Sequence, residues 1–167
     1  MEWQQVAPGF EPDGALRDIY VFGTDLSDWQ RVWEVLRTWD PLPDLTIAGQ
    51  TANMPEKVQD IFNVVQEQGA RLSVNVSGAI LNCFFFGDDE IEFDLVPDEV
   101  SGPTEFEGLA RFMSMLGRAT GKSVVMTTEN AREAVILRYE PDAQRLEWVG
   151  PPDDGWKVDI AAHHAGA

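Results

Sequence analysis

The sequence LSVNVSGAILNCFFFGDDEIEFDL, residues 72–95, alternates apolar and polar side chains through three successive segments. A period of two places neighbouring side chains on opposite faces of a β-strand. Short turn sequences separate the segments, so the pattern predicts an antiparallel meander of three strands. One face of this meander should lie in the core, and the other should be polar.

The alternation assigns each residue of the meander to a face. The predicted core face contains Leu72, Val74, Val76, Leu81, Cys83, Phe85, Ile91, Phe93 and Leu95. The predicted polar face contains Ser73, Asn75, Ser77, Asn82, Glu90, Glu92 and Asp94. Phe84 and Phe86 break this division, because they fall on the polar side. If the second and third strands pair across a tight Gly87-Asp88-Asp89 turn, both rings lie beside the acidic row of the third strand.

Helix and strand patterns occur on both sides of the meander. Apolar stripes at helical spacing predict three amphipathic helices, over residues 28–39, over residues 53–69, and from Thr104 to Gly117 or Gly121. Each begins with a capping-box spacing, formed by Ser27 and Gln30, Asn53 and Glu56, and Thr104 and Glu107. Further strands are predicted over residues 17–24, 45–50, 122–127, 134–140 and 145–149.

Together these elements predict an α+β fold. We expect a single domain over residues 17–149, with a largely antiparallel sheet whose central three-stranded meander is packed by three amphipathic helices. Residues 1–16 are predicted to be an N-terminal arm that docks through Trp3 and Phe10. Residues 150–167 are predicted to be a C-terminal tail that docks through Trp156.

Charge is the strongest global property of the chain. Its 167 residues include 29 acidic and 12 basic side chains, which give a net charge of −17. Such a field repels phosphate backbones and anionic lipids, so we expect no nucleic acid and no membrane as partner. Acidity can also serve solubility alone. However, residues 87–107 contain nine acidic side chains and no lysine or arginine, so the charge is concentrated. A basic protein is the complementary partner.

The sequence predicts a cytoplasmic protein. Its longest apolar runs are far shorter than the roughly 20 residues of a membrane-spanning helix. The first residues contain acidic side chains and no basic region before an apolar stretch, so they do not resemble a secretory signal. A single cysteine, Cys83, cannot form an intrachain disulfide.

No arrangement of residues in the body predicts a catalytic site. The two histidines, His163 and His164, lie in the predicted tail, so no catalytic triad is available. The acidic residues from Asp88 to Asp94 could supply oxygen ligands to a divalent cation, but alternate side chains of a strand are nearly 7 Å apart. We expect a non-enzymatic protein without a cofactor, and a divalent-metal enzyme remains a lesser alternative.

The acidic row and its two aromatic neighbours have the composition of a protein interface, because aromatic rings anchor a partner and carboxylates steer it. The predicted partner-binding residues are Phe84, Phe86, Asp88, Asp89, Glu90, Glu92 and Asp94. The alternative for the two phenylalanines is burial beneath a helix of the same chain.

The run NCFFFGDDEIEFDLVPDEV, residues 82–100, precedes FEGLARFMSMLGRATGKSVVMTTEN, residues 106–130. In this layout the chain resembles small acidic cytoplasmic immunity proteins of bacterial polymorphic-toxin systems, and the similarity extends over residues 17–149. The resemblance implies an α+β domain that neutralises a cognate toxin, often a basic nuclease, by covering its active surface. It transfers no individual binding residue. A cytosolic chaperone for a secreted effector is the other alternative, and such a chaperone would dimerise.

Overall fold

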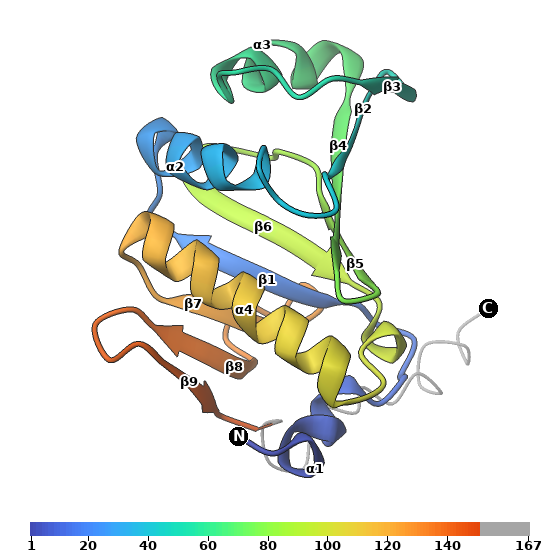
Figure 1. Ribbon diagram of the computed structural model, residues 1–167, viewed down its shortest axis with the longest axis vertical. Helices are drawn as coiled ribbons and strands as arrows, with labels where there is room; N and C mark the ends of the chain where they lie inside the picture. The colour runs from blue at the N-terminus through green and yellow to red at the C-terminus, as the bar shows by residue number, and fades with distance from the viewer. Residues whose placement is uncertain (151–167) are drawn as a thin grey trace, which may run out of the picture.

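The computed structural model describes residues 1–150 and places nine strands in one antiparallel sheet (Figure 1). The strands are β1 (Arg17–Phe22), β2 (Asp44–Ile47), β3 (Gln50–Ala52), β4 (Ala70–Val76), β5 (Ala79–Cys83), β6 (Glu90–Leu95), β7 (Val124–Thr128), β8 (Val135–Glu140) and β9 (Arg145–Trp148). Their order across the sheet is β3-β2-β4-β5-β6-β1-β7-β8-β9. The helices are α1 (Trp3–Val6), α2 (Leu26–Leu36), α3 (Gln59–Gln68) and α4 (Pro103–Thr120), with short 3-10 helices η1 (Ala7–Phe10) and η2 (Pro97–Glu99). The predicted α+β fold is confirmed.

The predicted meander is formed by β4, β5 and β6, which are neighbours in the sheet. β4 and β5 pair from Leu72 opposite Cys83 to Val76 opposite Ala79. Ser77 and Gly78 connect them with φ angles of 56° and 104°. A two-residue hairpin turn with positive φ at both positions matches the twist of the strands it joins. All nine residues of the predicted core face are buried.

The connection between β5 and β6 differs from the prediction. β5 ends at Cys83, and residues 84–89 form a loop in place of the expected tight turn at Gly87-Asp88-Asp89. Phe85 adopts a positive φ of 58° and turns its ring into a cluster with the rings of Trp29, Trp33 and Phe62, at centroid distances of 5.5, 6.0 and 5.9 Å. Burial of this aromatic ring therefore draws the chain away from the strand ladder.

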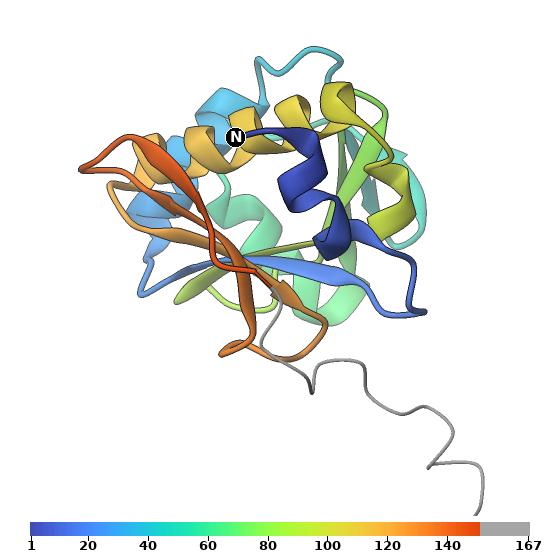
Figure 2. The ribbon, with the colours of Figure 1, turned by 90° about the horizontal axis from the view of Figure 1, so that it is seen from below.

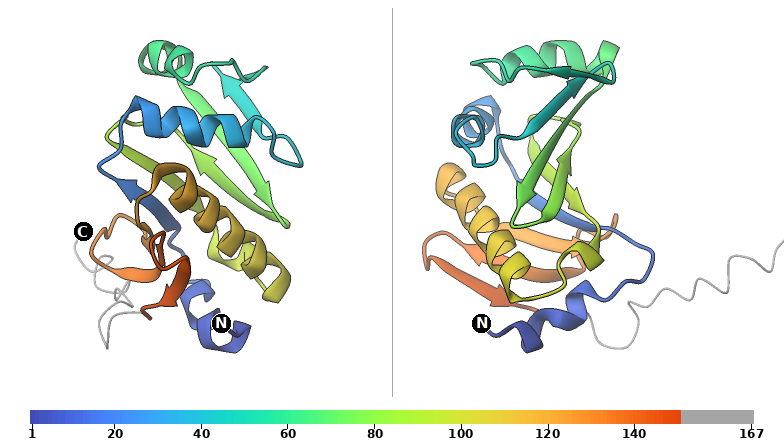
Figure 3. Two further views of the ribbon diagram at one scale, coloured as in Figure 1. Left: turned by 60° about the vertical axis from the view of Figure 1, so that its left-hand side comes forward. Right: turned by 45° about the vertical axis from the view of Figure 1, so that its right-hand side comes forward.

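Three amphipathic helices pack against the sheet, as predicted. α2 and α4 lie side by side across one face, and α3 lies at the end formed by β2, β3 and β4 (Figures 1 and 3). The buried apolar residues of α2 and α4 are Trp29, Val32, Trp33, Leu36, Phe106, Leu109, Phe112, Met113 and Leu116. The tryptophans of α2 therefore belong to the core.

The helix starts differ from the predicted capping boxes. At α2, the carboxylate of Asp25 accepts a hydrogen bond from the backbone N–H of Asp28, and Asp28 returns the interaction to Asp25. Neither α3 nor α4 has a side-chain cap. The predicted cap residue Gln30 acts elsewhere, since its Oε1 accepts from the backbone N–H of Val58 at 2.9 Å. It thus ties α2 to the beginning of α3.

Residues 1–16 pack closely against the domain at the lower end of α4 (Figures 1 and 2). Phe10 is only 3% exposed, and the ring of Trp3 stacks on it at 5.9 Å. The fully buried Arg17 holds this segment, because its guanidinium donates to the carbonyls of Gly9 and Glu11 and to the carboxylate of Asp13. The expected docking of Phe10 is confirmed.

Of the predicted C-terminal tail, residues 150–167, the structure describes Gly150 alone, so Trp156, His163 and His164 lie outside the described residues. Cys83 is a buried free thiol, and burial raises its pKa to about 12. Within residues 1–150, no helix has the length and apolar character to cross a bilayer.

Candidate functional site

Among residues 1–150, no helix lies over the side of β5, β6 and β1 that faces away from α2 and α4 (Figure 3), and we call this side the open face of the sheet. The open face consists of Asn82, Glu90, Glu92, Asp94, Asp18, Tyr20 and Phe22, with Phe84 directly after β5. Asp18 and Tyr20 lie at its inner part and are buried, with 3% and 2% of their surface exposed. β1 and β6 pair in register, with Asp18 opposite Asp94, Tyr20 opposite Glu92 and Phe22 opposite Glu90. Directly opposed side chains in an antiparallel pair lie about 5 Å apart. The pairing therefore adds a second carboxylate, Asp18, to the predicted acidic row.

Hydrogen bonds link the carboxylates of the open face. The hydroxyl of Tyr20 lies 3.1 Å from Oδ2 of Asp18 and 3.4 Å from Oε1 of Glu92. It carries one proton, so it can donate to only one of these acceptors at a time. Asp18 also accepts from the backbone N–H of Asn130 at 2.8 Å, and Asp94 accepts from the amide of Asn82 at 3.4 Å.

The pKa values of Asp18, Glu92 and Asp94 are all raised. Burial is the largest cause for each of them, because desolvation penalises the charged form. The negative charges of neighbouring carboxylates add to it, with Asp18 and Glu90 acting on Glu92, and Glu129 acting on Asp18 and Asp94. The same surroundings raise the pKa of the Tyr20 hydroxyl. The open face therefore carries more negative charge than its own groups neutralise.

Within residues 1–150, one cation makes a charged contact with this cluster. Arg132 donates two hydrogen bonds to the carboxylate of Glu90, at 2.6 and 2.8 Å. Its guanidinium also lies over the rings of Tyr20 and Phe22, 5.2 and 5.4 Å from their centroids. The guanidinium of Arg132 thus pairs with Glu90, at the start of β6. Glu92 and Asp94 form no ion pair with any described residue.

Phe84 and Phe86 are exposed and no helix of residues 1–150 covers them, so the alternative of burial beneath one of the predicted helices is wrong. Phe84 is 38% exposed and Phe86 is 73% exposed, and their ring centroids lie 5.9 Å apart. Beside Phe86, a hollow of about 220 Å³ separates the loop of residues 84–89 from α3, and its wall includes Phe62 and Val65. An aromatic pair next to a hollow can anchor an apolar side chain of a partner.

Asp88 and Asp89 lie on the same loop with exposed side chains. Their backbone is fixed by Thr24, whose hydroxyl donates to the carbonyl of Asp88 at 2.7 Å and whose N–H donates to the carbonyl of Asp89 at 3.0 Å. The loop therefore holds these two acids at the end of the open face. All seven predicted partner-binding residues lie on the open face or on this adjoining loop.

Asp18, Tyr20, Phe22 and Arg132 were missed by the sequence reasoning. The alternation of residues 17–22 contains a signal for the first three, because it places them on one face of a strand. It does not say which strand lies beside them. Arg132 belongs to an irregular loop and has no such signal.

Within residues 1–150, no three His, Cys, Asp or Glu side chains are grouped so that they could hold a metal ion. Comparisons with protein-family models, curated proteins and solved structures found no match to this chain. The geometry of the open face is therefore the basis for the function proposed below.

Proposed function

We propose that this chain is a non-enzymatic protein-binding domain, an immunity-type inhibitor that neutralises a basic toxin or effector in the bacterial cytoplasm. The observation that carries the proposal is the excess of carboxylates on the open face beside two exposed phenylalanine rings. Glu92 and Asp94 are partly exposed, their pKa values are raised, and they form no ion pair with any residue from 1 to 150. A lysine or arginine of a partner would supply the missing charge.

Aromatic rings beside the carboxylates provide apolar surface for contact with a partner. Tyr20 and Phe22 stack at 5.0 Å on β1, and Arg132 already lies over both rings. The face thus already holds one guanidinium against aromatic rings and a carboxylate. Because Tyr20 is only 2% exposed, an arginine from a partner would contact the ring of Phe22, which is 40% exposed. Phe84 and Phe86 provide apolar area at the edge, where burial contributes to affinity.

Acidic charge also favours a fast encounter. A net charge of −17 attracts a basic protein from a distance, and the strength of this attraction falls with added salt. An inhibitor must bind its toxin before the toxin acts, so rapid association serves this function. The open face would cover the partner's basic active surface and thereby exclude its substrate.

The test begins with the double variant Glu92→Gln/Asp94→Asn and a charge-matched control, Glu107→Gln/Asp142→Asn. Both control positions are exposed and lie away from the open face, on α4 and on the turn between β8 and β9. Each immobilised protein is exposed to a lysate of the native host. We expect the wild type and the control to retain a basic protein that the double variant loses.

The captured protein is then purified, and its association is measured at several salt concentrations. We expect the double variant to associate at least about tenfold more slowly, with a weaker dependence on salt. Expression of the captured protein alone should arrest growth, and the wild-type chain should restore it better than the double variant. Equal binding by the double variant and the control would refute the site, and a captured protein without toxicity would refute the inhibitor function.

A further inference from the structure

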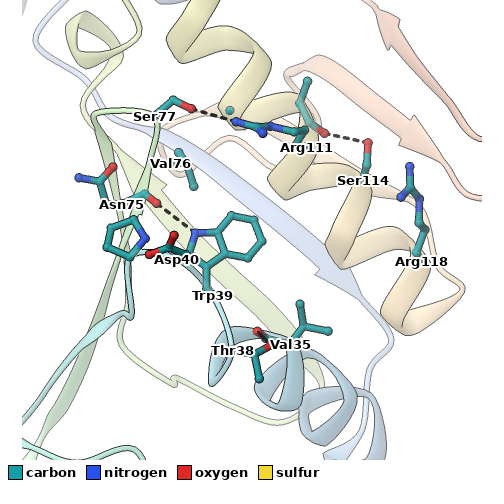
Figure 4. A pocket seen from close by; sticks show the side chains of 13 residues that line it. Val35, Thr38, Trp39, Asp40, Asn75, Val76, Ser77, Arg111, Ser114 and Arg118 are labelled. Carbon is teal, nitrogen blue, oxygen red and sulfur yellow. Dashed lines mark hydrogen bonds between the residues drawn. The ribbon is translucent and has the colours of Figure 1, made fainter.

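A second site lies in the helix layer, away from the open face. It is a groove of about 720 Å³ between the C-terminal end of α2, the end of β4, and α4 (Figure 4). Trp39 lies at its centre, Asn75 and Ser77 border it on one side, and Arg111 and Arg118 border it along α4. Its volume falls within the range of about 300–1,000 Å³ that is typical of small-molecule sites.

The two sides of the groove are fixed by close packing. Gly108 allows α4 to approach the turn between β4 and β5, because a Cβ at this position would lie 2.6 Å from Oγ of Ser77. One turn further along, Nη2 of Arg111 donates to the same Oγ at 3.1 Å. On the other side, Nε1 of Trp39 donates to the carbonyl of Asn75 at 3.1 Å. The groove is thus preformed.

Its arginines differ from most others in the molecule. Arg31, Arg132, Arg138 and Arg145 each lie within ion-pair distance of a carboxylate. Arg111 and Arg118 make no ion pair with any residue from 1 to 150, although the chain contains 29 acidic side chains. They lie seven residues apart, about two turns of α4, so both border the same groove.

We infer that the groove binds a small organic anion with a planar body. Arg111 and Arg118 would take its phosphate or carboxylate head, because the guanidinium fork matches both groups. The indole of Trp39 would contact the planar body. Asp40, which also lines the groove, limits the negative charge that can be accepted. A single head group suits this site better than an acidic peptide, which would extend beyond the two arginines over a chain of net charge −17.

This inference does not depend on the protein partner proposed above, and its test uses separate probes. Calorimetric titrations of the full chain with phenyl phosphate, benzoate and inorganic phosphate compare the two head groups and the contribution of the ring. We expect phenyl phosphate or benzoate to bind more tightly than inorganic phosphate, because only the first two carry a ring for Trp39. Whichever of the two binds more tightly identifies the head group.

Two variants and a control locate the binding. We expect the affinity for the tighter-binding aromatic probe to fall by about tenfold or more in Arg111→Gln and in Arg118→Gln, because each variant loses a charge-assisted hydrogen bond. Arg71→Gln removes an exposed arginine of β4 that does not line the groove, and it should leave binding unchanged. Thermal unfolding checks that each variant is folded.

Three results would overturn the inference. One is the absence of heat with all three probes, and another is an equal affinity for the Arg111→Gln and Arg71→Gln proteins. The third is tighter binding of a glutamate hexapeptide than of either aromatic anion, which would assign the groove to an acidic protein segment.

Discussion

The open face and the α4 groove carry opposite charges that the molecule does not pair with each other. Within residues 1–150, Glu92 and Asp94 form no ion pair on the open face, and Arg111 and Arg118 form none in the groove, although Asp40 also lines it. The strands hold the acids on one face of the sheet, and α4 holds the arginines in the layer that covers the other. Since internal pairing would have cancelled both charges, the separation leaves two surfaces of opposite sign, as the two proposed partners of opposite charge require.

The largest expected effect concerns the aromatic edge of the open face. Phe86→Ala should weaken the proposed protein complex by about 2 kcal/mol or more, as an anchoring aromatic residue does. Stability should change by less than about 0.5 kcal/mol, because the ring is 73% exposed. Leu42→Ala is the control, since Leu42 is 61% exposed and lies outside both sites. Titration calorimetry of the complex measures the effect. An equal loss of affinity in the two variants would show that Phe86 does not belong to the interface.

The groove can be broken through its packing. Gly108→Ala should lower the free energy of unfolding by about 1–2 kcal/mol, because the new methyl group overlaps Ser77 and lies 2.9 Å from the carbonyl oxygen of Val76. The substitution should also weaken binding of the aromatic anion in the groove, and the affinity for the protein partner should not change. Chemical denaturation measures the stability change.

A second substitution checks that cause. Ser77→Gly removes the overlapping side chain and suits the positive φ of 56° at this turn. The double variant Ser77→Gly/Gly108→Ala should therefore recover part of the lost stability. No recovery would place the cost of Gly108→Ala elsewhere.

The smallest expected effect sharpens the account of the open face. The pKa of Glu92 is raised in the folded protein, so folding favours its protonated form and its charged form opposes folding as the pH rises through that pKa. Glu92→Gln should therefore increase the melting temperature by a few degrees at pH 7, and the gain should disappear below the carboxyl's unfolded pKa of about 4.3. The amide oxygen can still accept from Tyr20.

The same variant should associate more slowly with the protein partner. A change that stabilises the chain and impairs binding indicates that the charge is retained for function. Melting curves from pH 4 to pH 8 test the first part. A variant that is less stable than the wild type at pH 7 would contradict the unfavourable charge inferred for Glu92.

The two regions were not equally predictable from the sequence. The alternation of residues 72–95 identified the buried face of the meander and the acidic row, because a period of two depends on neighbouring residues alone. The partner of that row, β1, is separated from β6 by about 70 residues, so Asp18 and Tyr20 could not be assigned to it. Local pattern contains no information about that pairing.

The loop of residues 84–89 and the groove could not be predicted from the sequence, because both depend on contacts between distant elements. Phe85 lies on the core side, as predicted, but its ring packs against Trp29 of α2 and Phe62 of α3. This packing ends β5 earlier than the alternation of the sequence indicates. Arg111 and Arg118 are two basic residues on the polar side of an amphipathic helix, a pattern that ordinarily indicates a solvent-exposed face and no site. Their groove depends on how closely α4 approaches the β4–β5 turn, which Gly108 permits but does not specify.

The buried guanidinium of Arg17 sets a limit on how far the chain can be shortened. A protein beginning at residue 14 would lack Gly9, Glu11 and Asp13, so the guanidinium would lose these acceptors and the segment that packs over it, and would keep the carbonyls of Ala15 and Leu16. Arg17 begins β1, so the strand that supplies Asp18 and Tyr20 would lose this anchor. The acidic face therefore depends on residues 9–13, which are not part of it but hold Arg17 in β1.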